Sequence, residues 1–509
     1  MENLLQSNSV SLSRRAIQAK EECPINAEYT LPDYCPDMAV VLKCMAHPRV
    51  QNRQLTGESL LVDGMAAVRV LYLDEERQCV RSVEFTSPFS CSMQVASGNL
   101  NASHVCLDLN TKYVNCRAVT PRRLEVWGVV SVDACADAIY EKQVAQPMAD
   151  NSLYTRCQTF SFSTPMAVAE KIITVNESLE FPESLPSAEM LLGGECNAVV
   201  TECKLLSGKA IVKGQIYIHQ LYCDNLSTGS THCLDFVLPF SQILDVENGE
   251  EGMPYDVNVL LLSDTERCSV GPDGENTVLE VTVKLLVQWQ TYCKREISLL
   301  LDAYHGKYPL THKSSELELY TYHGCRTEQT MLPLKVTLPK VPLQEVLDVW
   351  VQTAVPTVAY DNQRVTLTDR LTVCMLLRDG DGQIQYFEHP EEYRLEYPCQ
   401  GNDPTAQLTV TEQRYRVCDG CLELQLMLCV NLKMRDCQKH TVLTDVTLCY
   451  EKPYPSQRAS VLMYYAQPGE DVWSIGRACH TSPERIRAEN ELEDSTLQES
   501  CVLLVPTST

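Results

Sequence analysis

The feature that most constrains the fold is an internal repeat, because two copies of one sequence pattern predict two copies of one structural unit. Residues 31–42 read LPDYCPDMAVVL and residues 181–192 read FPESLPSAEMLL, an offset of 150. The matching positions include Pro32 and Pro182, Pro36 and Pro186, Leu42 and Leu192, Val62-Asp63-Gly64 and Val212-Lys213-Gly214, and Leu71-Tyr72 and Leu221-Tyr222. With one inserted residue, Pro88-Phe89 falls on Pro239-Phe240, and later Leu124-Glu125-Val126 corresponds to Leu279-Glu280-Val281.

A third and more diverged copy follows the second. Its matching segments are Leu338-Pro339 with Pro342, Val346-Leu347, Leu376-Leu377 in place of Leu71-Tyr72, and Leu422-Glu423-Leu424. Asp369 stands where the first two copies have a glycine. We therefore expect the third repeat either to turn differently at this point or to lack a close backbone approach there.

Each repeat has the pattern of short β-strands. The segment Ser59–Leu73 is rich in β-branched and aliphatic residues and alternates partly with period two. Asp379-Gly380, Asp381-Gly382 and Asp419-Gly420 are typical of hairpin turns. The proline-rich heads predict an irregular segment and then one helical or extended turn. The sequence thus predicts a mainly β fold of three tandem repeats, each a sandwich or an open barrel.

The charge of the chain argues against one class of partner. Lys and Arg number 42 against 67 Asp and Glu, a net charge of −25. Such a field repels phosphate backbones, so we expect no nucleic-acid partner. Uncharged ligands or proteins with basic surfaces fit better.

The compartment is predicted from the cysteines and from the apolar runs. The 25 cysteines are odd in number and scattered through a long chain, unlike a secreted disulfide framework. The first residues lack the apolar core of a secretory signal, and no apolar run is long enough for a transmembrane helix. We expect a protein of the reducing cytoplasm that is neither secreted nor membrane-spanning.

We expect no catalytic residues, metal ligands or cofactor, and hence no enzyme. Cys418 and Cys421 flank a hairpin signal rather than a βαβ unit, and a second ligand pair for zinc is not evident. The Gly-Lys pairs at 208–209 and 306–307 lack the earlier glycine and the following Ser or Thr of a phosphate-binding loop. The sequence also has no Gly-x-Ser-x-Gly motif.

The last fifty residues have a different pattern from the repeats. From residue 464 they read YYAQPGEDVWSIGRACHTSPERIRAENELEDSTLQESCVLLVP. Asp471 and Ser482 suit helix N-caps, and Pro483 suits the first position of a second helix. The order predicts a strand, two helices and a closing strand. Trp473, Ile475 and Ile486 are the expected structural residues.

This order resembles the LysM domain over nearly all of residues 464–506. The resemblance rests on Gly469, Trp473, Ile475, Thr481-Ser482, Ile486, Asn490, Leu492 and the final Leu-x-Val-Pro. LysM domains usually bind N-acetylglucosamine-containing glycans in a shallow groove. By position, the resemblance implies one side formed by Gly469, Glu470, Asp471 and Val472, and the other by Asn490, Glu491 and Leu492.

The module departs from that pattern in its charge. Glu470-Asp471 replaces Asp-Thr, and Ser500 replaces a frequent glycine. From residue 460 onward there are three Arg, no Lys and eight Asp or Glu, so the net charge is −5. This acidity favours a basic protein surface over an anionic wall polymer as the partner.

The repeats resemble the SPOCS domain of sporulating bacteria through the Leu-Pro-x-x-x-Pro head, the Val-x-Gly and Leu-Tyr strand pair, and the Pro-Phe step. Tandem SPOCS repeats followed by LysM are similar to the SipL-type spore coat morphogenesis family, over roughly residues 27–507. The resemblance implies a non-catalytic scaffold in the mother-cell cytoplasm that tethers the coat basement layer at the forespore surface. The implied partners are the coat morphogenetic ATPase and other coat proteins.

The expected division of the chain follows from these assignments: an N-terminal segment 1–26, repeats at 27–165, 166–320 and 321–452, a linker at 453–459, and the LysM-like domain at 460–509. The alternative function is a peptidoglycan-binding envelope protein that acts through its LysM domain. A wall hydrolase has little support, because the repeats carry no catalytic motif and no export signal is visible.

Overall fold

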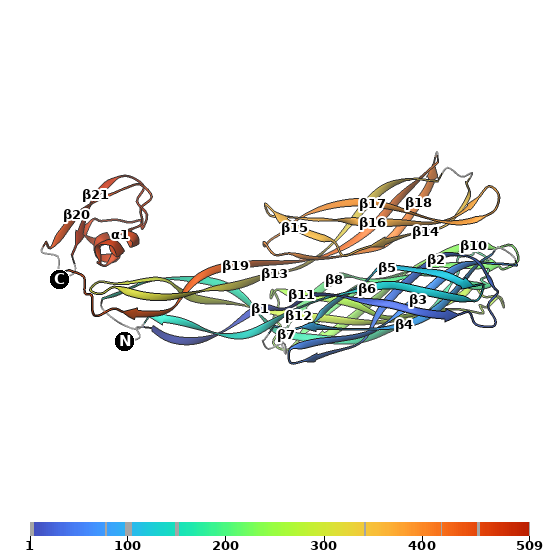
Figure 1. Ribbon diagram of the computed structural model, residues 1–509, viewed down its shortest axis with the longest axis horizontal. Coiled ribbons are helices and arrows are strands. Elements are labelled where there is room, and N and C mark those ends of the chain that lie inside the picture. The colour runs from blue at the N-terminus through green and yellow to red at the C-terminus, as the bar shows by residue number, and fades with distance from the viewer. Residues whose placement is uncertain are drawn as a thin grey trace.

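The computed structural model describes residues 5–76, 79–96, 104–147, 152–339, 343–418, 420–455 and 459–507. They form three β-units that assemble side by side, a narrow stalk, and a small module near the end of that stalk (Figure 1). The predicted mainly β fold is confirmed. Within these ranges neither helix has the length needed to span a bilayer.

Each unit is a sandwich of two antiparallel sheets. In one sheet the last strand lies between the first strand and the last but one, and the remaining strands form the second sheet. The first unit contains β1 (Leu5–Thr30), β2 (Met38–Thr56), β3 (Ser59–Asp74), β4 (Val80–Gln94), β5 (Cys106–Thr120) and β6 (Arg123–Pro147). The second contains β7 (Leu153–Glu180), β8 (Met190–Leu206), β9 (Lys209–Asn225), β10 (Ser230–Asp245), β11 (Tyr255–Ser269) and β12 (Val278–His305). The third contains β13 (Leu310–Thr337), β14 (Leu343–Thr353), β15 (Thr357–Asp361), β16 (Arg364–Asp379), β17 (Ile384–Pro398), β18 (Thr405–Cys418) and β19 (Cys421–Leu448).

The divisions expected at 165/166 and 320/321 fall inside β7 and β13, and the segment 1–26 lies mostly in β1. The reason is the pairing of first and last strands. Each unit begins with a long strand that precedes its proline-rich head, so the head that marks the repeat in the sequence lies inside the unit.

The proline-rich head and the Leu-Tyr pair belong to one local structure. In the first unit the head is irregular over residues 31–37 and then continues directly into the extended strand β2. The hydroxyl of Tyr72 donates to the carbonyl of Pro36 (3.3 Å), and that of Tyr222 donates to Pro186 (2.8 Å). Both tyrosines are fully buried. The tyrosine thus supplies a hydrogen-bond partner to a head whose irregular backbone has no strand partner at this point.

The Val-x-Gly and Pro-Phe motifs also act together. Gly64 lies opposite Phe89, and Gly214 opposite Phe240. A Cβ on Gly214 would lie 2.3 Å from Cζ of Phe240 and 2.3 Å from the carbonyl oxygen of Val199 on β8. Glycine is therefore required both for the aromatic ring and for the neighbouring backbone.

The third unit shows the consequence of losing this glycine. Asp369 lies opposite Tyr393, and the second strand is interrupted between β14 and β15 at residues 354–356. The gap lies opposite residues 369–370. The third unit thus lacks the continuous strand that lies opposite the glycine in the other two units.

The two hairpins predicted in the third unit are present. Arg378 pairs with Ile384 across the Asp-Gly turns, and Cys418 pairs with Cys421. Gly420 has a φ of 72°, as the turn requires. Asp419 lies outside the described residues. The Cys-x-x-Cys sequence is thus part of a tight β-hairpin.

The three units share a core of their own in addition to the core inside each sandwich. A bulge in the second strand turns one leucine out of the ladder in each unit, at Leu42, Leu192 and Leu347. These leucines belong to a cluster with residues of all three units, including Leu71, Leu221, Leu376 and Trp350. The matching Leu42 and Leu192 of the sequence repeat therefore mark a contact between units.

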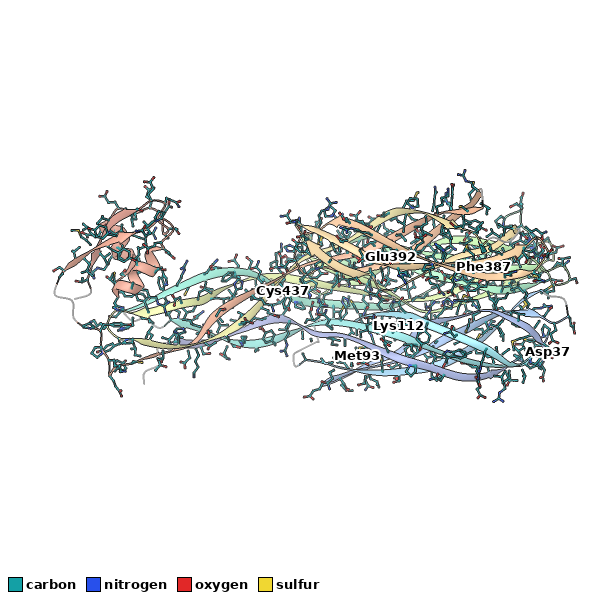
Figure 2. The ribbon with its side chains drawn as sticks, turned by 45° about the horizontal axis from the view of Figure 1, so that its top comes forward. Asp37, Met93, Lys112, Phe387, Glu392 and Cys437 are labelled. Atoms are coloured by element: carbon teal, nitrogen blue, oxygen red, sulfur yellow. The ribbon has the colours of Figure 1, made fainter. Side chains whose placement is uncertain are left out.

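The units contact one another in a closed ring. The sheet edges that meet are β4 with β8, β10 with β14, and β17 with β2. The polar contacts are Arg69 to the carbonyl of Gly194 (3.0 Å), His219 to Asp348 (2.9 Å), and Glu388 to Lys43. The third unit thus returns to the first, and both lie side by side in the body, where Lys112 marks the first and Phe387 the third (Figure 2).

The three contacts differ in chemistry although they occupy equivalent positions. Lys43, Gly193 and Asp348 each follow the bulge and lie opposite the matching leucines of the central strands. Gly193 has a φ of 132°, and a Cβ there would lie 2.4 Å from Cδ of Arg69. The residue at each of the three positions matches the residue that its neighbour presents, which favours this order of the units.

The stalk consists of the outer ends of the three first-and-last strand pairs (Figure 1). These are residues 5–15 with 137–147, 153–165 with 292–305, and 310–322 with 435–448. Each pair has a bulge at its inner end, at Ala16, Met166 and His323. Buried residues of all three pairs form two apolar clusters that hold the stalk together, among them Leu12, Leu299 and Leu317.

Candidate functional site: the C-terminal module and the stalk

The C-terminal module has the expected order of elements. It consists of β20 (Val461–Ala466), α1 (Val472–Cys479), α2 (Pro483–Glu489) and β21 (Cys501–Pro506), with the two strands antiparallel. The carboxylate of Asp471 accepts from the amide of Trp473, and the hydroxyl of Ser482 accepts from that of Arg485. Both N-caps follow the preference for short polar side chains.

Two of the three expected structural residues lie in the module core. Ile475 and Ile486 are 1% and 0% exposed, and they pack with residues of both strands. Trp473 lies outside this cluster, because its ring is directed at the stalk. Its indole nitrogen donates to Asp302 of β12 (2.8 Å), and the ring meets that of Tyr304 edge-on at 4.9 Å.

The first predicted side of the groove, Gly469–Val472, is tied to the loop at 495–497. Gly469, at a φ of 86°, donates its amide to the carbonyl of Leu497 (2.7 Å), and Val472 donates to Ser495 (2.8 Å). The Glu470 carboxylate accepts from the amide of Gln467 and from the hydroxyl of Tyr464.

The second predicted side is tied to β21 instead. The side-chain amide of Asn490 donates to the carbonyls of Ile486 and Leu504 and accepts from the amide of Leu504 at 2.7 Å. Glu491, at a φ of 52°, is exposed, and Leu492 is partly buried. The hydrogen bonds of the two predicted sides thus run to different parts of the module, and the polar side chains of Glu470 and Asn490 are engaged in its internal structure.

The module docks through α1 on the outer end of the β7–β12 pair. Asp302 accepts from Trp473 and from the guanidinium of Arg477 (2.8 Å), and Arg156 pairs with Asp471 (2.8 Å). The hydroxyl of Tyr304 donates to the carbonyl of Thr481 (2.7 Å) and lies against Gly476, where a Cβ would come within 2.6 Å of it.

The opposite side of the module carries an exposed apolar face. It is formed by alternate residues of the two strands: Val461, Met463, Tyr465, Val502 and Leu504, which are 42–73% exposed. Met463 lies opposite Leu504, and Tyr465 opposite Val502. Both strands lie farther from the stalk than α1 does (Figure 1). We call this set the sheet face of the module.

Sequence reasoning missed the sheet face, although a signal was present. The segments VLMYYA and CVLLVP are apolar at nearly every position. A two-stranded sheet can bury only one side against two helices, so a strand that is apolar on both sides leaves one apolar side uncovered.

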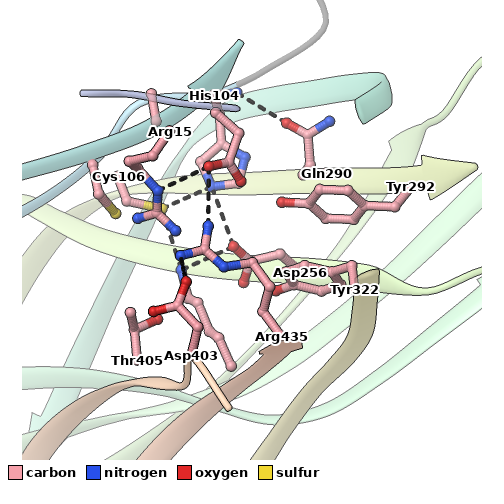
Figure 3. A pocket seen from close by; sticks show the side chains of 14 residues that line it. Arg15, His104, Cys106, Asp256, Gln290, Tyr292, Tyr322, Asp403, Thr405 and Arg435 are labelled. Atoms are coloured by element: carbon pink, nitrogen blue, oxygen red, sulfur yellow. Dashed lines mark hydrogen bonds and ion pairs between the residues drawn. The ribbon is translucent and has the colours of Figure 1, made fainter. Parts of the chain in front are cut away.

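A cluster of charged and aromatic side chains lies where the stalk joins the body (Figure 3). Arg435 contacts Asp137 of the first unit (3.2 Å) and Asp403 of its own unit, and Arg15 pairs with Asp137 at 2.8 Å. The ring of Tyr292 stacks on that of Tyr322 at 3.9 Å, which joins the second unit to the third.

The charges of this junction balance. Lys433 donates to Asp256 (2.9 Å) and to the sulfur of Cys106 (3.2 Å), so three cations face three carboxylates. Burial lowers the pKa of His104, which keeps its ring neutral. The cavity at the junction is about 30 Å³, enough for a water molecule but not for a substrate. The junction is therefore a structural connection between units.

Comparison with known proteins gives one match. The family described as SipL, SPOCS domain, matches residues 22–119 and 188–265, within the first and second units. No curated protein and no solved structure matches the chain.

Proposed function

We propose that the chain is a non-catalytic scaffold in spore coat assembly, because two of its segments match the family described as SipL, SPOCS domain, which suggests a sporulation-related role. In this proposal the ring of units and the stalk form a rigid support. The C-terminal module, a LysM-like domain, contacts the coat morphogenetic ATPase and so tethers the coat basement layer at the forespore surface from the mother-cell cytoplasm.

The sheet face of the module is the observation that carries this proposal. Five neighbouring apolar side chains are exposed on a module that has a net charge of −5 from residue 460 onward. An apolar centre with a polar, charged surround is the usual composition of a protein–protein interface. Because the helices face the stalk, the sheet face is directed outward, where a partner can reach it.

The contacts of the predicted groove residues also favour a protein over a glycan as the partner, although less directly than the sheet face does. Glycans are held by neutral hydrogen-bonding groups, yet the side chains of Glu470 and Asn490 already bond within the module. Asp471 caps α1 and pairs with Arg156. Glycan binding here would compete with these internal contacts.

The test is binding of the purified full chain to the coat ATPase, with Met463→Asp as the variant. We expect Met463→Asp to weaken binding at least tenfold, because a carboxylate in the centre of the sheet face must be desolvated on binding. Met331→Asp is the matched control, since Met331 is an exposed methionine on β13 of the third unit.

Equal binding by Met463→Asp and the wild-type chain would refute the assigned surface. Sedimentation of the full chain with insoluble peptidoglycan, competed by chitin oligomers, would instead favour the envelope function. A fluorescent fusion that stays spread through the mother cell during sporulation would contradict the scaffold role.

A further inference from the structure

A group of metal-binding side chains lies at the contact between the second and third units. His219 on β9, Cys233 on β10 and Asp348 on β14 bring a ring nitrogen, a thiol sulfur and a carboxylate oxygen within 4.8 Å of one another. Asp348 comes from a different unit, so the group forms only when the ring of units is assembled. The side chains of His219 and Asp348 are 17% and 8% exposed.

The spacing of the donor atoms fits a tetrahedral ion. Nε2 of His219 lies 2.9 Å from Oδ1 of Asp348, and Sγ of Cys233 lies 3.6 Å from the same oxygen. Bonds of about 2.0–2.3 Å to a tetrahedral zinc ion place its ligand atoms roughly 3.3–3.6 Å apart. The two distances to Asp348 are therefore within a few tenths of an ångström of those around a zinc ion.

An independent feature points to the same use. Nδ1 of His219 lies 2.7 Å from Oδ1 of Asp235, on the far side of the ring from Asp348. A carboxylate in this position holds the proton on Nδ1, so that Nε2, which contacts Asp348, can bind a metal once its own proton is lost, as in carboxylate–histidine–zinc sites. The side chain of Asp235 is 73% exposed.

A carboxyl group next to this set could supply a fourth ligand. Glu195 lies directly opposite His219 on β8, and both line a cavity of about 260 Å³ together with Asp235. Either Glu195 or water would complete four-fold coordination.

The equivalent contacts of the ring do not offer such a set. At the positions of His219 and Cys233 the first unit has Arg69 and Ser82, and the third has Cys374 and Tyr386. The contact between the first and second units is a hydrogen bond from Arg69 to a backbone carbonyl. The contact between the third and first units is an ion pair between Glu388 and Lys43.

We propose that His219, Cys233 and Asp348 bind a divalent transition-metal ion, with zinc the best match, which joins the third unit to the second. A thiolate, an imidazole and a carboxylate together suit zinc rather than magnesium or calcium. Binding requires the thiolate of Cys233 and the unprotonated Nε2 of His219, so the thiol proton and one imidazole proton leave as the ion enters.

The test is titration of the metal-free full chain with Co²⁺ as the probe. We expect a sulfur-to-cobalt charge-transfer band that Zn²⁺ abolishes by displacement. Cys233→Ser removes this band, whereas Cys157→Ser, a change at an exposed cysteine of the stalk, retains it. Asp235→Asn lowers the Co²⁺ affinity about 10–100-fold, because it no longer orients the ring of His219.

Circular dichroism shows whether each variant is folded. If Cys233→Ser does not fold, the Co²⁺ affinity of Asp235→Asn tests the proposal, because the side chain of Asp235 is exposed and its replacement should not affect folding. The proposal is overturned if the wild-type chain gives no charge-transfer band, if the band survives in Cys233→Ser, or if Asp235→Asn binds Co²⁺ as tightly as the wild type.

Discussion

Replacing Leu192 by alanine tests whether the units form one cooperative structure. Leu192 is 0% exposed and lies in the core shared by the three units, in the same cluster as Trp350 of the third unit. A buried Leu→Ala change costs about 2–5 kcal/mol through lost transfer free energy and the residual cavity. We expect the free energy of unfolding to fall by an amount in this range. We also expect the fluorescence of Trp350 to change, although Trp350 is in the third unit and the substitution is in the second.

The assay is urea unfolding followed by far-ultraviolet circular dichroism and by the emission of a variant in which Trp350 is the sole tryptophan. The matched control is Leu234→Ala, since Leu234 is 1% exposed inside the second sandwich. The control should destabilise the second unit by a similar amount and leave the native emission of Trp350 unchanged. A Leu192→Ala chain with unaltered Trp350 emission and a loss below about 1 kcal/mol would refute the shared core.

Three further changes test other parts of the structure. Asp302→Ala should shift the emission of Trp473 to longer wavelength, because the indole loses its acceptor and its docked position; an unchanged spectrum would contradict docking in solution. Gly214→Ala should lower the thermal midpoint well beyond Gly249→Ala, where the nearest contacts of a Cβ are 3.1 Å and longer, and equal midpoints would argue against the close approach. Burial raises the pKa of Glu266 from 4.5 to about 7, so the stability it confers is complete below pH 4.5 and is lost as the pH rises to 7; Glu266→Gln should reduce this loss in a pH series of unfolding midpoints, and an identical pH profile would count against it.

The repeat sequence predicted the units well because its motifs are local structures. Pro36 and Tyr72 bond to each other within one unit, and Gly64 with Phe89 forms one cross-strand contact. Such pairs leave a signal at fixed spacing. The change at Asp369 was informative for the same reason, since glycine at this position is needed for close cross-strand contacts.

The closed ring could not be predicted, because its contacts join residues that share no local pattern. Lys43 and Glu388 are far apart in the sequence, and neither belongs to a matching motif. The group of His219, Cys233 and Asp348 escaped a search for metal-ligand spacing because its ligands come from two units. Leu42 and Leu192 were visible as a match, but a matching leucine does not reveal whether it faces its own core or its neighbour.

The C-terminal module was predicted in its order of elements but not in its docking. Ile475 and Ile486 lie at the positions where an amphipathic helix buries its apolar side chains, and Asp471 and Ser482 are residue types preferred at N-caps. Trp473 fits the same pattern, yet its ring packs on the stalk because Tyr304 and Asp302 lie there. The role of the predicted groove residues remains a prediction.

The contact between Lys43 and Glu388 offers the most direct test of the ring, because it joins the first unit to the third. Carbodiimide treatment forms an isopeptide bond only between side chains that already touch. We predict a cross-link between the peptides that carry Lys43 and Glu388, detected by mass spectrometry and lost in Glu388→Gln. A linear array of units would instead give no such link under conditions in which the 2.8 Å pair of Lys213 and Glu202, within the second unit, is cross-linked.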